Sequence, residues 1–168
     1  MKLEYIKCHG SGNEFVMIDS TRVDLQGVDL AELSRFVCNR TEAIGADGLL
    51  LLCLKEGVYG MRMFNPDGSE AEMCGNGIRC VGKYVYDKGY TEKTELAVET
   101  LSGIRYLNLH VSDGKVDSVS VPSEALSEIQ KGLSYRYPYA AATDTPSKKT
   151  ATEQKGREKD LEASEHTP

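Results

Sequence analysis

The sequence predicts one soluble domain of mixed strands and helices that is followed by a polar tail. The chain has 168 residues, of which 40% are hydrophobic and 27% charged, and this composition fits one ordinary domain or two very small ones. Strand-sized apolar runs alternate with two stretches of helical periodicity, and turns rich in Asn, Asp and Gly separate them. Residues 138–168 contain only one Val, Ile, Leu or Phe, namely Leu161, so the predicted core ends early.

The predicted domain begins with two strands and a helix. Residues 3–8 and 14–19 favour strands joined by the Gly- and Asn-rich turn at 10–13. Asp29 and the Glu three residues later form a capping-box pattern, and apolar residues at helical spacing follow. These signals predict a helix that runs to about Cys38 and covers a sheet.

The remaining elements follow from the same patterns. Apolar residues on more than one face of residues 75–88 predict a deeply buried helix that ends at Gly89. Further strands are predicted at residues 49–54, 60–64, 94–100, 104–111 and 116–121, of which the last two form a hairpin.

Residues 122–168 are predicted to form a low-complexity, disordered tail. Their apolar surface is too small to offset the entropy lost on ordering. The alternative is a short charged helix around residues 151–163, because Glu and Lys are good helix formers. Neither version carries chemistry.

Charge and hydropathy exclude several classes of function. The net charge of −6 and the pI of about 5.2 have the wrong sign for a protein that binds the nucleic-acid backbone. The longest apolar run, residues 49–54, is far shorter than the roughly 20 residues that cross a bilayer. The first residues lack the apolar segment of a secretion signal. We therefore expect a cytoplasmic protein without nucleic-acid or membrane partners.

The cysteine and histidine pattern favours neither a disulfide framework nor a metal site. The five cysteines are an odd number without a CxxC pair, so reduced thiols are expected. His9 is next to Cys8 in a predicted strand, and adjacent strand residues point to opposite faces. The glycine-rich residues 45–48 lack the Lys-Ser/Thr of a phosphate-binding loop. We expect neither a metal ion nor a cofactor.

The densest group of special residues is the polar, glycine-rich stretch 64–77, which links a predicted strand to the buried helix. The Gly-Asn-Gly sequence at 75–77 leaves the first helical amides uncovered, and such a helix start binds anions such as a carboxylate. Cys74 comes directly before it, where the same field favours a thiolate that acts as a base or nucleophile. The alternative for Cys74 is a small buried apolar side chain.

Two loop asparagines are candidates to complete a pocket. Asn13 follows the glycine-rich turn and Asn65 follows a strand, and each offers amide donors and acceptors. The alternative is a role in turn geometry, which asparagine also favours. The four cysteines other than Cys74 are expected to be structural.

Four motifs together resemble the N-terminal half of diaminopimelate epimerase, over residues 1–121. They are HGSGNEF at 9–15, GADG at 45–48, FNPDGS at 64–69 and CGNGIRC at 74–80. The resemblance implies inversion of an α-carbon of diaminopimelate, from the LL to the meso form, without pyridoxal phosphate, in lysine and peptidoglycan biosynthesis. It also implies an α+β fold in which a mixed, mostly antiparallel sheet wraps around a central helix.

The resemblance assigns roles to the candidate residues. Cys74 would be one of two cysteines that remove and return the α-proton from opposite faces of the substrate. Gly75 and Asn76 would hold the α-carboxylate, whereas Asn13 and Asn65 would bind the other polar groups. The α-proton is very weakly acidic, so a preorganised anion site must stabilise the charge that develops on its removal.

The resemblance ends at residue 121, so several functions stay open. The second thiol and the Glu-Arg stretch of the family's C-terminal half do not occur in the 168 residues, and we expect turnover to need a complementary half. Ser11, Glu14 and Gly48 also depart from the pattern of the family. The alternatives are a non-catalytic half-domain that binds an amino acid, a subunit that forms a homodimer, and a racemase or isomerase for another amino acid.

Overall fold

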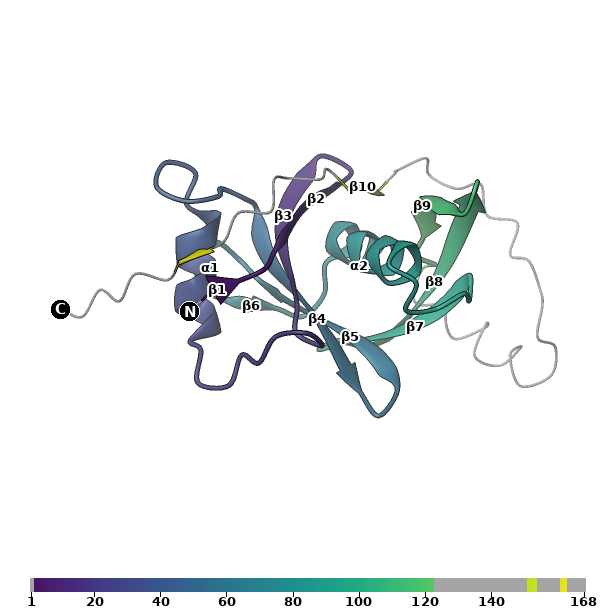
Figure 1. Cartoon of the computed structure of the whole chain (residues 1–168), viewed down its shortest axis with the longest axis horizontal. Coiled ribbons are helices and arrows are strands. Elements are labelled where there is room, and N and C mark those ends of the chain that lie inside the picture. The colour runs from purple at the N-terminus through teal and green to yellow at the C-terminus, as the bar shows by residue number, and fades with distance from the viewer. Residues whose placement is uncertain (1, 123–150, 154–160, 163–168) are drawn as a thin grey trace.

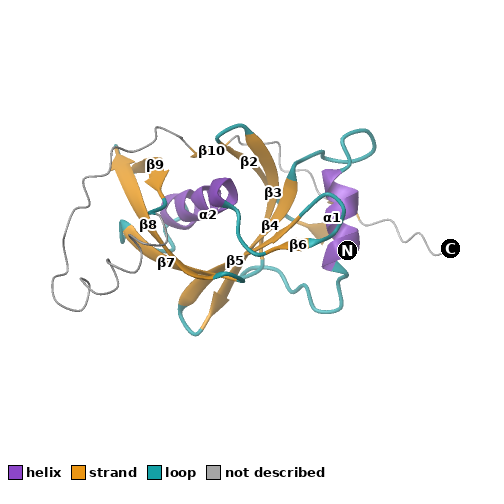
Figure 2. Cartoon of the chain, turned by 180° about the vertical axis from the view of Figure 1, so that it is seen from behind, coloured by secondary structure: helices purple, strands orange, loops and turns teal. Residues whose placement is uncertain are grey.

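The structure is a computed structural model that describes residues 2–122, 151–153 and 161–162. A strongly curled sheet wraps around one helix, and a second helix packs outside the curl (Figure 1). Figure 2 shows the same arrangement from behind. The expected α+β fold with a central helix is thus confirmed. No helix in the described ranges is long and apolar enough to cross a bilayer.

Two helices and eleven strands form the described part of the chain. The helices are α1 (Leu30–Cys38) and α2 (Gly75–Asp87). The strands are β1 (Lys2–Leu3), β2 (Ile6–Gly10), β3 (Asn13–Asp19), β4 (Gly48–Lys55), β5 (Val58–Phe64), β6 (Glu70–Ala71), β7 (Glu95–Thr100), β8 (Gly103–Ser112), β9 (Lys115–Ser120), β10 (Ala151–Glu153) and β11 (Leu161–Glu162). The predicted strand at residues 3–8 is interrupted, and β6 was not predicted.

The main sheet has the order β10-β2-β3-β4-β5-β7-β8-β9, and β6 pairs with β5. The β3–β4 and β5–β7 pairs are parallel. The other neighbours in this sheet are antiparallel, which makes it mixed and mostly antiparallel.

The central strands are buried on both faces. On β3, Phe15 and Met17 belong to the core around α2, whereas Val16 and Ile18 belong to the core beside α1. The leucines of β4 alternate in the same way. A strand covered on both faces needs a continuous apolar sequence, which explains the apolar run at residues 49–54.

Helix α1 begins at the predicted cap. The Asp29 carboxylate accepts hydrogen bonds from the backbone N–H groups of Ala31 and Glu32, both at 3.0 Å. The Glu32 side chain pairs with Arg35, so only the Asp29 half of the expected capping box is present.

Helix α2 lies inside the curl, and glycines allow the sheet to approach it closely. A Cβ atom at Gly77 would lie 2.8 Å from Leu50 of β4, and one at Gly82 would lie 2.8 Å from Leu107 of β8. Ile78, Val81 and other buried residues of α2 fill the concave core, which confirms the predicted deep burial.

Most of the predicted tail lies outside the described residues. Its two described segments are extended, since β10 pairs with β2 and β11 pairs with β1. In these short segments the backbone is therefore not in the helix that was the alternative for residues 151–163.

Candidate active site

Cys74 is the N-cap residue of α2. Its backbone is extended, with φ −139° and ψ 111°, and its Sγ atom accepts a hydrogen bond from the Gly77 N–H at 3.3 Å. The Cys74 carbonyl accepts from the Ile78 N–H at 2.9 Å, as the first helical bond requires. The sulfur of this half-buried residue therefore lies at the positive end of the helix dipole.

Two backbone donors next to this sulfur stay open. In the described part of the chain, nothing accepts a hydrogen bond from the N–H groups of Gly75 and Asn76. The prediction of uncovered amides therefore holds at these two positions, whereas the Gly77 N–H is taken by the cysteine. Open N–H groups at a helix start are suited to a carboxylate.

The hairpin end of β2 and β3 lies against the start of α2. Asn76 Nδ2 donates to Asn13 Oδ1 at 2.7 Å, which joins residues that are 63 positions apart. The approach requires Gly10, because a Cβ atom there would lie 2.5 Å from the Asn76 carbonyl oxygen. The structure thus brings together Asn13, Cys74, Gly75 and Asn76 of the predicted site.

Asn65 lies in the turn between β5 and β6. Its Nδ2 donates to Ser69 Oγ at 3.0 Å, and its backbone N–H donates to the Ser69 carbonyl at 2.8 Å. Within the described ranges no hydrogen bond joins Asn65 to the other site residues. These contacts fit the turn role that was its alternative, and its role toward a substrate stays a prediction.

Sequence reasoning did not single out Asp47, which stands beside Asn13. Its carboxylate accepts from the Glu14 N–H at 2.9 Å, from Arg40 at 2.9 Å and from Asn13 Nδ2 at 3.4 Å. The Glu14 N–H, followed by the Arg40 and Asn13 side chains, lowers the pKa of Asp47 below its ordinary value. Its place in the GADG motif, one of the four motifs of the resemblance, was the available signal.

Arg79 was also missed, although it lies in the CGNGIRC motif. Its Nη1 donates to Asn76 Oδ1 at 2.8 Å, and its Nε donates to the Val119 carbonyl at 3.3 Å. Residues three apart on a helix share a face, so the spacing of Asn76 and Arg79 was the available signal.

An open groove of about 560 Å³ adjoins the first turn of α2. Met73, Gly75, Arg79 and Arg105 are among the residues that line it. A ligand bound at the helix start therefore has space next to it, with two arginines and the single carboxylate of Glu72 in the lining.

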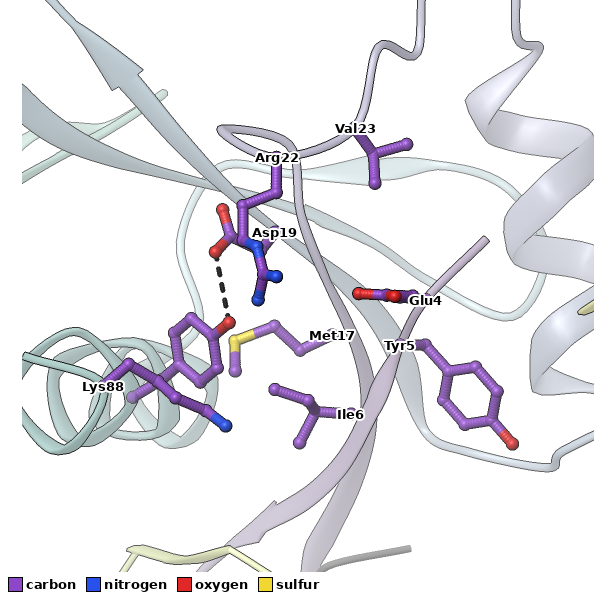
Figure 3. Close-up of a pocket in the computed structure, with 9 residues that line it drawn as sticks. Glu4, Tyr5, Ile6, Met17, Asp19, Arg22, Val23 and Lys88 are labelled. Atoms are coloured by element: carbon purple, nitrogen blue, oxygen red, sulfur yellow. Dashed lines mark hydrogen bonds between the residues drawn. The ribbon is translucent and has the colours of Figure 1, made fainter. Parts of the chain in front are cut away.

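A second polar cluster lies at the other end of α2, around Asp19 (Figure 3). The Asp19 carboxylate accepts from Tyr84 Oη at 3.1 Å and also from Tyr90 Oη. Its other oxygen accepts from the backbone N–H of Thr21 at 3.0 Å and from the hydroxyl of Thr21 at 2.6 Å. The cavity beside it is small, about 60 Å³.

This second cluster is suited to structure more than to binding. Burial, followed by the charge of Asp19, strongly raises the pKa of the Tyr84 hydroxyl, so Tyr84 stays a hydrogen-bond donor. Lys88 lies over the Tyr84 ring, 5.7 Å from its centroid. Among the described residues, no three His, Cys, Asp or Glu side chains form a group that could hold a metal ion.

Comparisons with a family model and with individual relatives all match this chain to diaminopimelate epimerases. The family model for diaminopimelate epimerase matches residues 5–122. The diaminopimelate epimerase of Methanococcus maripaludis is 47% identical over 120 residues, which cover 71% of this chain and 43% of the relative. That of Moorella thermoacetica is 49% identical over 120 residues, with the same coverage of 71% and 43%. The chain thus spans less than half the length of these relatives.

Solved structures of the same fold share little sequence with the chain. A hydroxyproline epimerase from Agrobacterium vitis has a TM-score of 0.57 at 18% identity, over 71% of this chain and 41% of that one. A probable proline racemase from Agrobacterium radiobacter has a TM-score of 0.58 at 17% identity, with the same coverage of 71% and 41%. At such low identity these likenesses show the fold alone.

Proposed function

The chain belongs to the diaminopimelate epimerase family, and from that premise we propose that it supplies one half of a cofactor-independent epimerase for diaminopimelate. The observation that carries the proposal is the position of Cys74, whose sulfur caps α2 next to the open N–H groups of Gly75 and Asn76. A base and an anion site are thus adjacent, as removal of a proton next to a carboxylate requires.

The proposed inversion begins with a thiolate at Cys74. The sulfur takes the α-proton, so the C–H bond breaks, an S–H bond forms and the electron pair moves toward the substrate carboxylate. The N–H groups of Gly75 and Asn76 and the helix dipole stabilise that negative charge. A second acid on the opposite face then donates a proton to the carbon and completes the inversion.

The second acid belongs to a complementary half or to a second copy of the chain in this proposal. The chain covers 43% of the length of its Methanococcus relative, so the activity of a complete enzyme is proposed for the assembly. Cys74 alone is still expected to exchange the α-proton with solvent on its own face of the substrate.

This expectation is tested by incubating the full chain with LL- and meso-diaminopimelate in heavy water and following the α-protons by NMR. The wild-type chain should incorporate deuterium, and Cys74→Ser should reduce the rate by about a hundredfold or more because the base is lost. Cys53→Ser is the matched control, since Cys53 is also half-buried but lies on β4.

The outcomes separate the candidate functions. No exchange by the wild-type chain, or exchange that survives Cys74→Ser, counts against catalysis by this sulfur. Saturable binding of diaminopimelate without exchange instead supports a non-catalytic half-domain. Exchange of a different amino acid at a higher rate would reassign the substrate within the same chemistry.

A further inference from the structure

Four side chains form a continuous hydrogen-bonded row across the start of α2, which we call the amide bridge: Asp47, Asn13, Asn76 and Arg79. Arg79 Nη1 donates to Asn76 Oδ1 at 2.8 Å, and Asn76 Nδ2 donates to Asn13 Oδ1 at 2.7 Å. Asn13 Nδ2 then donates to Asp47 Oδ2 at 3.4 Å. The row crosses from helix α2 to the first residue of β3 and on to the loop before β4.

The two charged ends allow only one orientation of the two amides. An arginine side chain has no acceptor, and an ionised aspartate has no donor. Arg79 therefore requires the oxygen of Asn76, which directs the Asn76 nitrogen toward Asn13 and in turn the Asn13 nitrogen toward Asp47. The same orientation of both amides satisfies Arg79 and Asp47. Arg79 constrains it more strongly, because its bond of 2.8 Å is shorter than the bond of 3.4 Å to Asp47.

Both ends of the amide bridge are held by the fold. Arg40 donates at 2.9 Å to Asp47 and at 2.9 Å to Glu14. Gly45, at φ +77°, allows this approach, because a Cβ atom there would lie 3.0 Å from the Arg40 Cα. At the other end, the Val119 carbonyl of β9 accepts a hydrogen bond from Arg79 Nε at 3.3 Å.

We infer that Arg79 and Asp47 are positioning residues that keep N–H groups of Asn13 and Asn76 available for a substrate carboxylate. Each amide nitrogen has two hydrogens and uses one inside the bridge, so one donor per amide remains. A reversed amide would present its oxygen to the carboxylate and repel it. The inference rests on the proposed function, since it takes an amino acid as the ligand.

The variants Arg79→Lys and Arg79→Gln test the inference. Lysine only donates and preserves the orientation. The glutamine amide both donates and accepts, and because the long 3.4 Å bond to Asp47 constrains the row only weakly, glutamine permits either orientation. Lys83→Gln is the matched control: it removes a positive charge one turn later on α2, where Lys83 donates at 2.7 Å to Asp87 and at 2.7 Å to the Val116 carbonyl.

The first measurement is the side-chain amide NMR signals of Asn13 and Asn76 in the full chain without ligand. Wild type, Arg79→Lys and Lys83→Gln should each show one sharp pair of signals per amide, and Arg79→Gln should shift and broaden both pairs. Unchanged signals in Arg79→Gln would overturn the inference, because Arg79 would then not set the orientation.

The second measurement is titration with meso-diaminopimelate. Arg79→Gln should weaken binding about tenfold, and Arg79→Lys and Lys83→Gln should stay within about twofold of wild type. Equal binding by Arg79→Gln, or an equal loss in Lys83→Gln, would overturn the positioning role. A wild-type chain that binds no diaminopimelate refutes the proposed function, and the amide signals then still decide whether Arg79 orients the amides.

Discussion

The two ends of α2 carry polar groups of opposite character. At the C-terminal end, the Asp19 carboxylate accepts four hydrogen bonds, from Tyr84, Tyr90 and two groups of Thr21. At the N-terminal end, the N–H groups of Gly75 and Asn76 have no acceptor within the described ranges, and an open groove lies beside them.

The contrast separates stability from function on one helix. A buried carboxylate whose partners are all present fixes the helix against β3 and has no capacity left for a ligand. A helix start with open donors gains little stability from them but can bind an anion. Substitutions at the C-terminal end of α2 should therefore affect stability, and substitutions at its N-terminal end should affect chemistry.

The largest expected effect tests the Asp19 cluster at the C-terminal end of α2. Asp19→Asn should lower the free energy of unfolding by about 3 kcal/mol, because an amide cannot accept at both oxygen positions and leaves tyrosine hydroxyls without an acceptor. Urea denaturation measures the loss. Asp24→Asn, at an exposed carboxylate that accepts from the Gln26 N–H at 2.8 Å, should cost much less. Equal losses in the two variants would contradict the stabilising role of the Asp19 cluster.

A substitution next to the N-terminal end of α2 should affect both stability and the reactivity of Cys74. Gly10→Ala places a methyl group where a Cβ atom would lie 2.5 Å from the Asn76 carbonyl, so the first turn of α2 must move. We expect a loss of about 2 kcal/mol in unfolding free energy and slower alkylation of Cys74. Gly60→Ala is the control, since its nearest contact would be an ordinary 3.6 Å. Unchanged alkylation in Gly10→Ala would show that this close contact does not shape the site.

Alkaline pH should weaken the stabilising contacts around Asp19 at the C-terminal end of α2. The pKa of Tyr84 is raised above its ordinary 10.0, first by burial and then by Asp19. Above about pH 10 the unfolded chain loses this proton while the folded chain keeps it, so stability falls as the pH rises. At about pH 11 we expect roughly 1 kcal/mol of this loss in wild type and none of it in Tyr84→Phe. Parallel pH profiles of unfolding for the two proteins would contradict this assignment.

The smallest expected effect tests the cap. Cys74→Ser should change the unfolding free energy by less than about 0.5 kcal/mol, because serine is also a good N-cap residue. Cys74→Ala should cost about 1 kcal/mol, because the Gly77 N–H loses its acceptor. Thermal or urea unfolding of the two variants measures the difference. A large loss in the serine variant would mean that the sulfur is mainly structural.

The sequence predicted the features that depend on neighbouring residues. The start of α1 at Asp29 and the start of α2 after Cys74 both followed from local patterns. The bond between Asn13 and Asn76 did not, because it depends on how the sheet curls around α2. The Asp19 cluster was missed for the same reason, since its carboxylate and Tyr84 are 65 positions apart.

The most direct test of this account is the rate at which each cysteine reacts with iodoacetamide at about pH 6.5, followed by mass spectrometry of the folded chain. Cys74 should react about tenfold or more faster than Cys53, because its sulfur caps the N-terminus of α2 and accepts from the Gly77 N–H, whereas Cys53 lies within strand β4. Both residues belong to the same half-buried class, which makes Cys53 the matched comparison. Equal rates, or faster reaction at Cys53, would contradict the claim that the start of α2 holds a reactive base.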